Sequence, residues 1–100
     1  MEMHPHFQQP ELFDFVNKNG MVAIGYCPIG LPNRPERDKT ADDTVPIEDP
    51  AIVSNSKSTR YSSCRCLHQW AVQNGQIPIP FSVKPEKFMS NMGRSLEIIV

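Results

Sequence analysis

With 100 residues the chain has room for one domain at most, and its apolar fraction of 39% is below that of a typical globular chain. The net charge of −1 comes without a basic block, so nucleic acid is not expected as a partner. No apolar run approaches the roughly 20 residues that cross a membrane, and a signal-peptide pattern is missing, so no membrane association is expected. The odd number of cysteines, 3, speaks against a disulfide framework and favours a reducing, cytoplasmic setting.

Proline and glycine mark the ends of the first predicted helix. Residues 1–9 are predicted to end a strand and make a turn. Pro10 suits the first position of a helix and Gly20 the position just after its end. The apolar stripe of this helix is supplied by Leu12, Phe13 and Val16.

The segment Met21–Cys27 has an uninterrupted apolar centre, which predicts a strand buried on both faces, as in a parallel sheet. Ligands bind at the carboxyl ends of such strands, so the residues that follow are candidates for a site. A long polar loop is expected over residues 28–47. Asp49 and Pro50 then predict the cap and first residue of a second helix.

From Ser54 to Ser63 no apolar periodicity is found, and helix-averse residues dominate. Order is expected again at Trp70–Gln73, followed by Asn74 and Gly75 as a stop and by a short strand over Ile77–Phe81. A further helix is predicted to begin at Pro85. Strands and helices thus alternate, which favours a parallel α/β sheet.

Two regions carry a family resemblance. His4–Leu12 together with Gly25–Gly30 resembles the fifth and sixth strands of aldo-keto reductases. Trp70–Gln73, leading to Ile79–Val83 and then Asn91, resembles the seventh strand and the helix after it. The resemblance implies a partial (β/α)₈ TIM barrel of about strands 5–7, with residues 1–100 as a single partial NADP-dependent oxidoreductase domain.

The resemblance also implies a cofactor face. Tyr26 would stack its ring on a nicotinamide, which the flat π-face of tyrosine suits. The pyrophosphate and its loop would be lined by Cys27, Ile29 and Leu31. The adenosine end, with its 2′-phosphate, would be met by Ser82, Val83, Lys87 and Asn91.

Phe81 stands where the family commonly has a lysine that pairs with the 2′-phosphate. A charge-assisted contact to phosphate is among the stronger hydrogen bonds, so its loss weakens the preference for the phosphorylated cofactor. NADP(H) is the cofactor that the resemblance implies, and NAD(H) stays open.

The implied activity is reduction of small aldehydes and ketones to alcohols. The family's catalytic Asp, Tyr, Lys and His come from earlier strands, for which this sequence has no counterpart, so no catalytic residue is assigned and the chain alone is predicted inactive. The alternative is a non-catalytic truncated pseudoenzyme or an interaction fragment. The substrate and the oligomeric state stay open.

Two further interpretations concern unusual segments. Cys64, Cys66 and His68 are zinc-ligand types without a fourth ligand at a usual spacing, so no metal is expected. Codons can be chosen for Ser62–Gln69 that read, one base later, as an apolar, family-like helix. We therefore expect a compensated frameshift within residues 54–69, and a second slip over 93–100. His4 and His6 are expected to have structural roles.

Overall fold

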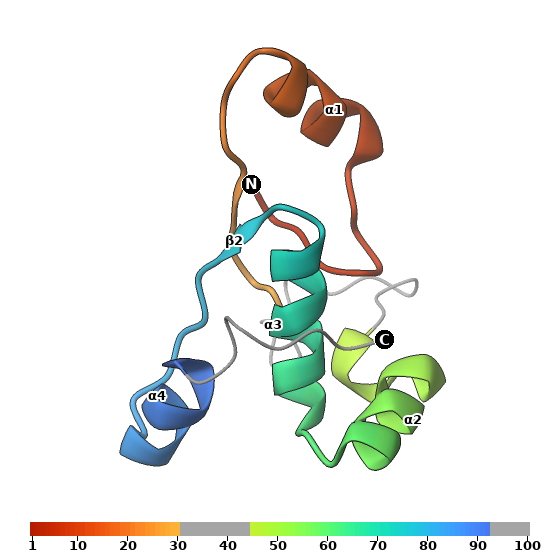
Figure 1. The fold of residues 1–100 in the computed structure, drawn as a ribbon, viewed down its shortest axis with the longest axis vertical. Coiled ribbons are helices and arrows are strands. Elements are labelled where there is room, and N and C mark those ends of the chain that lie inside the picture. The colour runs from red at the N-terminus through yellow and green to blue at the C-terminus, as the bar shows by residue number, and fades with distance from the viewer. Residues whose placement is uncertain (31–44, 93–100) are drawn as a thin grey trace, which may run out of the picture.

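The computed structural model describes residues 1–30 and 45–92. In chain order the elements are α1 (Pro10–Lys18), β1 (Ile24–Gly25), the 3₁₀ helix η2 (Pro46–Glu48), α2 (Pro50–Thr59), α3 (Ser63–Gln73), β2 (Ile77–Pro78) and α4 (Pro85–Met92). β1 and β2 are parallel, and Ile24 lies opposite Ile77. Helices α2 and α3 lie between the two strands in the sequence (Figure 1). The described residues therefore form the predicted parallel α/β arrangement, on a small scale.

The local signals for helix ends are confirmed. Pro10 is the first residue of α1, and Gly20 adopts a left-handed φ of 71° just after its end. Asp49 caps α2, since its Oδ1 accepts a hydrogen bond of 2.8 Å from the backbone N–H of Ala51. Gly75 also has a left-handed φ, 80°, after the end of α3. Short-range chemistry thus determined these ends.

The predicted loss of order after Ser54 is wrong. α2 continues to Thr59, and α3 begins at Ser63 behind an N-cap at Ser62. Helix-averse hydroxyl side chains are accommodated because they return a hydrogen bond to the helix, as Thr59 Oγ1 does to the carbonyl of Asn55 at 2.6 Å. Tertiary packing further stabilises α2, since its residue Ile52 is buried in the core.

The strand around Met21–Cys27 is not buried on both faces, so the prediction of a strand covered on both sides is wrong. Ala23 is only 3% exposed, whereas the next residue on the opposite face, Ile24, is 51% exposed. Alternate burial is typical of a sheet that is covered on one side. The covered face packs against Met3, whose Cβ would be 3.4 Å from a Cβ added to Gly25, and α3 lies against β2. Nothing among the described residues buries the other face, whose exposed side chains are Val22, Ile24, Tyr26, Ile77 and Ile79.

The core lies between α2 and α3. Ile52, Cys66 and Leu67 form its buried centre, and Leu67 has no exposed surface. In contrast, α1 contains no buried residue and projects from one end of the molecule (Figure 1). None of the helices in the described part of the chain is long and apolar enough to span a membrane.

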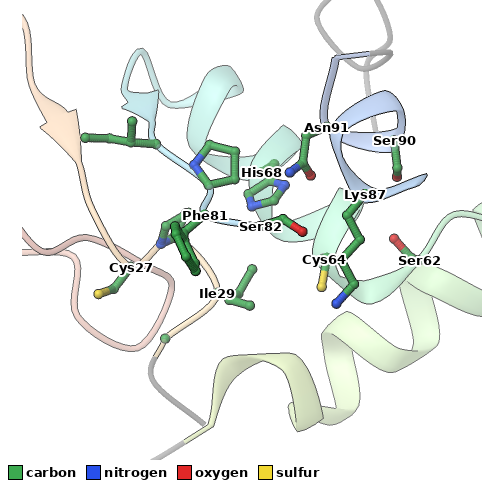
Figure 2. A pocket seen from close by; sticks show the side chains of 14 residues that line it. Cys27, Ile29, Ser62, Cys64, His68, Phe81, Ser82, Lys87, Ser90 and Asn91 are labelled. Carbon is green, nitrogen blue, oxygen red and sulfur yellow. The ribbon is translucent and has the colours of Figure 1, made fainter. Parts of the chain in front are cut away.

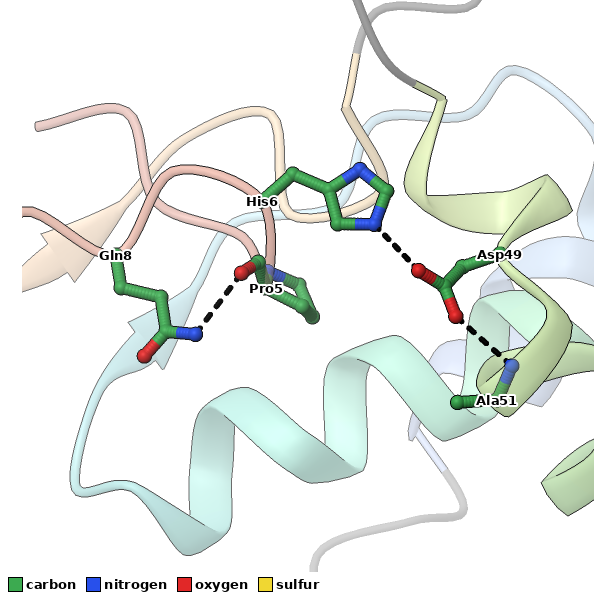
Figure 3. A network of polar contacts seen from close by, with 5 residues as sticks. All are labelled: Pro5, His6, Gln8, Asp49 and Ala51. Carbon is green, nitrogen blue, oxygen red and sulfur yellow. Dashed lines mark hydrogen bonds and ion pairs between the residues drawn. The ribbon is translucent and has the colours of Figure 1, made fainter.

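A polar contact joins the N-terminal turn to α2 (Figure 3). His6 Nε2 donates to Asp49 Oδ2 over 2.7 Å, across 43 positions of sequence. This hydrogen bond, followed by that from the N–H of Ala51, lowers the pKa of the Asp49 carboxyl below its ordinary value. His6 therefore has a structural contact, and His4 is buried.

Candidate functional site

A cavity of about 450 Å³ lies where the segments that follow β1 and β2 meet α3 and α4 (Figure 2). This volume is within the range of about 300–1,000 Å³ that is usual for small-molecule sites. Its lining consists of Cys27, Pro28, Ile29, Gly30, Ser62, Cys64, His68, Ile79, Pro80, Phe81, Ser82, Lys87, Ser90 and Asn91. The cavity thus lies beyond the carboxyl ends of two parallel strands, where α/β proteins bind ligands.

The wall after β1 is a tight turn. The N–H of Gly30 donates to the carbonyl of Cys27 over 2.9 Å, and both residues have a left-handed φ, 52° at Cys27 and 78° at Gly30. Gly30 also lies against Pro46: a Cβ on Gly30 would be 2.6 Å from the proline Cδ. A side chain at this position would force the turn and η2 apart, so glycine is required here.

The wall after β2 continues the sheet and then enters α4. The N–H of Ile79 donates to the carbonyl of Gly25 over 3.0 Å, which fixes this segment beside β1. Ser82 Oγ accepts a hydrogen bond of 3.1 Å from the N–H of Lys84, just before α4 begins at Pro85. The first turns of α4 then bring Lys87 and its neighbours to the cavity.

The third wall was missed by the sequence analysis. Ser62, the N-cap of α3, accepts a hydrogen bond of 3.2 Å from the N–H of Arg65, and Cys64 and His68 follow it along the cavity. Cys66 instead belongs to the core. The signal was present in the spacing, because residues four apart share a helix face and residues two apart do not. It was obscured because this segment was not predicted to be helical.

The charge of the lining favours an anion. Lys87 is the one lysine or arginine among the lining residues that the structure describes, and none of them is a carboxylate. Burial raises the pKa of the Cys64 thiol, and the charge of Lys87 lowers it in part. The ammonium and the thiol are therefore close enough to influence each other, and Figure 2 shows both side chains directed toward the same space.

Of the eight predicted cofactor residues, some line the cavity and others do not. The cavity brings together Cys27, Ile29, Ser82, Lys87 and Asn91. Tyr26 and Val83 do not line it, and they are 49% and 76% exposed. Leu31 lies outside the described residues. Phe81 lines the cavity with a side chain that is 89% exposed.

The described residues contain no group of three or more His, Cys, Asp or Glu side chains that could hold a metal ion. Cys64 and Cys66 lie on different faces of α3, one in the cavity and the other in the core, so this helix does not direct both thiols to one ion. All three cysteines of the chain are free thiols.

Comparison with known proteins points to one family. No protein-family model matches the chain. It is 33% identical over 92 residues to an aldo/keto reductase of Synechocystis sp., covering 92% of this chain and 28% of that protein. It is 35% identical over 91 residues to aldo-keto reductase family 1 member A1 of Xenopus tropicalis, covering 91% of this chain and 27% of that protein.

A comparison with solved structures points to the same family. The crystal structure of an aldo/keto reductase from Brucella melitensis superposes with a TM-score of 0.77 at 25% identity, over 99% of this chain and 33% of that one. The chain thus spans less than a third of the length of the two curated relatives. Over the residues that it shares with them, the chain is a homologue of the aldo-keto reductases.

Proposed function

We propose that the chain is the cofactor-side segment of an NAD(P)H-dependent carbonyl reductase, equivalent to about strands 5–7 of a (β/α)₈ barrel. The observation that carries the proposal is the convergence of five predicted cofactor residues on one cavity. They come from segments more than 50 positions apart in the sequence, after two different strands. In this reading residues 1–100 are one partial oxidoreductase domain. The three free thiols support a cytoplasmic location.

The lining fits the phosphorylated end of a dinucleotide. Lys87 offers an ammonium, Ser82 a hydroxyl and Asn91 an amide, and the lining has no carboxylate among the described residues to repel phosphate. The turn over Cys27–Gly30 and the side chain of Ile29 form the opposite wall. Leu31 and Val83 complete the cofactor face in this proposal.

Tyr26 is proposed as the platform for the nicotinamide. It stands at the end of β1 on the uncovered face of the sheet, and half of its side chain surface is exposed, so its ring is accessible for stacking. The reduced nicotinamide supplies a hydride when it is bound. A carbonyl group also needs a positioned acid that protonates the forming alkoxide, and we assign this role to none of the 100 residues. We therefore expect the 100-residue chain to bind the dinucleotide without turning over a carbonyl substrate.

Isothermal titration calorimetry of the chain with NADPH and NADH tests the binding. We expect saturable binding that Lys87→Met weakens at least about tenfold, because a lost charge-assisted contact costs roughly 1.5–3 kcal/mol. Lys57→Met is the matched control, since Lys57 is exposed on α2 and does not line the cavity. Absence of binding for either dinucleotide, or equal losses in the two variants, would refute the proposal. Reduction of an aldehyde by the chain would show that our inactive assignment is wrong.

The second candidate is a non-catalytic interaction fragment, and one specific observation favours it. The uncovered sheet face presents Val22, Ile24, Ile77 and Ile79, each at least half exposed. Apolar side chains gathered on one sheet face are typical of a surface that contacts another protein. Sedimentation velocity without dinucleotide separates the candidates: self-association that Ile24→Lys abolishes would favour the interaction fragment.

A further inference from the structure

The cavity has two chemically different ends (Figure 2). Cys27, Ile29 and Phe81 gather at one end, which we call the strand end. Lys87, Cys64 and Ser62 gather at the other, which we call the Lys87 end. The Lys87 end is built by the first turn of α3 and by α4, so it includes residues that the proposed cofactor face does not use.

The Lys87 end combines a cation with a nucleophilic atom. Cys64 is half-buried in the cavity wall, and its sulfur is directed toward the ammonium of Lys87. The ammonium lies near enough to oppose the effect of burial on the thiol. Cys66, two residues further along the same helix, is 3% exposed in the core and is closed to solvent molecules.

We propose that the Lys87 end is a covalent site for small anionic α,β-unsaturated carbonyl compounds: Lys87 holds the anion while the sulfur of Cys64 adds to the β-carbon. The cavity has room for a small molecule of this kind, and its other lining groups at this end, Ser62 and Ser90, are hydroxyls. The inference shares the cavity with the proposed function but does not depend on dinucleotide binding.

The addition needs no oxidant or reductant. The thiol loses its proton to solvent, and the thiolate lone pair forms the S–C bond at the β-carbon. The π electrons of the C=C bond move onto the carbonyl oxygen as an enolate, which then takes a proton from water at the α-carbon. Burial raises the pKa of the Cys64 thiol. Because only the thiolate adds to the β-carbon, the rate rises about tenfold per pH unit while the pH is below that pKa.

Two maleimides test the proposal, since maleimide is an α,β-unsaturated carbonyl: neutral N-ethylmaleimide and anionic N-(2-carboxyethyl)maleimide. The chain is treated at pH 8 in low salt, and peptide mass mapping gives the rate at each cysteine. At Cys64 we expect the anionic reagent to be favoured about fivefold, after normalisation to free cysteine, and 1 M salt to remove this preference. At Cys27, at the strand end, no such preference is expected, and Cys66 should stay unmodified.

Lys87→Met should abolish the anionic preference at Cys64, whereas Lys57→Met should leave it unchanged. Both lysines are exposed, so neither variant is expected to unfold the chain. Loss of the preference in the first variant alone supports the proposal. A preference that survives Lys87→Met, or a Cys64 that reacts as slowly as Cys66, overturns it.

Discussion

Replacement of Gly30 by alanine probes the turn that forms one wall of the cavity. Gly30 has a φ of 78°, and an added Cβ would be 2.6 Å from Cδ and 3.2 Å from Cγ of Pro46. Pro46 is buried and its ring cannot rotate away, so η2 or the turn has to move. The left-handed backbone costs an alanine about 1–2 kcal/mol, and overpacking adds about 1–3 kcal/mol.

Gly75→Ala is the matched control. Gly75 has a φ of 80°, and an added Cβ would meet nothing within 4 Å. Both variants carry the same backbone strain and the same gain from a stiffer unfolded chain, so the difference between them isolates the contact with Pro46. We expect Gly30→Ala to lose about 2 kcal/mol more than the control.

Urea unfolding followed by far-ultraviolet circular dichroism measures the difference. With an m-value of about 1–3 kcal/mol/M, it corresponds to a midpoint roughly 1 M lower for Gly30→Ala than for Gly75→Ala. Equal midpoints for the two variants would refute the contact between Gly30 and Pro46, and with it this wall of the cavity.

Three further predictions address the cap, the cofactor and the gene. Asp49→Asn keeps a capping side chain but removes the charge. The folded pKa of Asp49 lies below its ordinary 3.8, so the carboxylate stabilises the fold above about pH 4, and this stabilisation is lost as the pH falls through the folded pKa. The urea midpoints of the two proteins should therefore converge in acid, and a gap that stays constant would contradict this. Phe81→Lys should raise the affinity for NADPH over NADH roughly tenfold in calorimetry, whereas Met89→Lys, which is also exposed but outside the lining, should not. The coding DNA for residues 54–69 and 93–100 should give family-like sequence in another frame, and its absence there would refute the frameshift.

The sequence predicted best what short-range chemistry determines. Pro10 and Gly20 mark the bounds of α1, and Asp49 with Pro50 marks the start of α2, because caps and positive φ depend on a few neighbouring atoms. The parallel pairing of β1 with β2 was also predicted from the alternation of elements. The polar loop predicted over residues 28–47 falls mostly on residues 31–44, outside the described residues.

The sequence predicted less where tertiary packing decides. Ile24 was expected inside a sheet covered on both faces, but what covers a strand depends on elements remote in sequence, and here one face is open. α2 and the start of α3 are poor in helix formers, yet Ile52 and Leu67 bury each other and retain the helices.

In the candidate site, too, some residues could be predicted from the sequence and others could not. Cys27 could be expected at the cavity because it follows a strand and strand ends gather in parallel sheets, whereas Ser82 was expected there only from the family resemblance. Cys64 and His68 could not, because their shared helix face becomes visible only when Ser62 is known to begin a helix.

The proposed function requires a dinucleotide to bind in the cavity beyond β1 and β2. Amide chemical shifts of the ¹⁵N-labelled chain, followed during titration with NADPH, test it most directly. We predict saturable shifts concentrated at Cys27–Gly30 and at Ser82–Asn91, with little change in α1. Shifts that concentrate in α1, or a spectrum that NADPH leaves unchanged at millimolar concentration, would contradict the account.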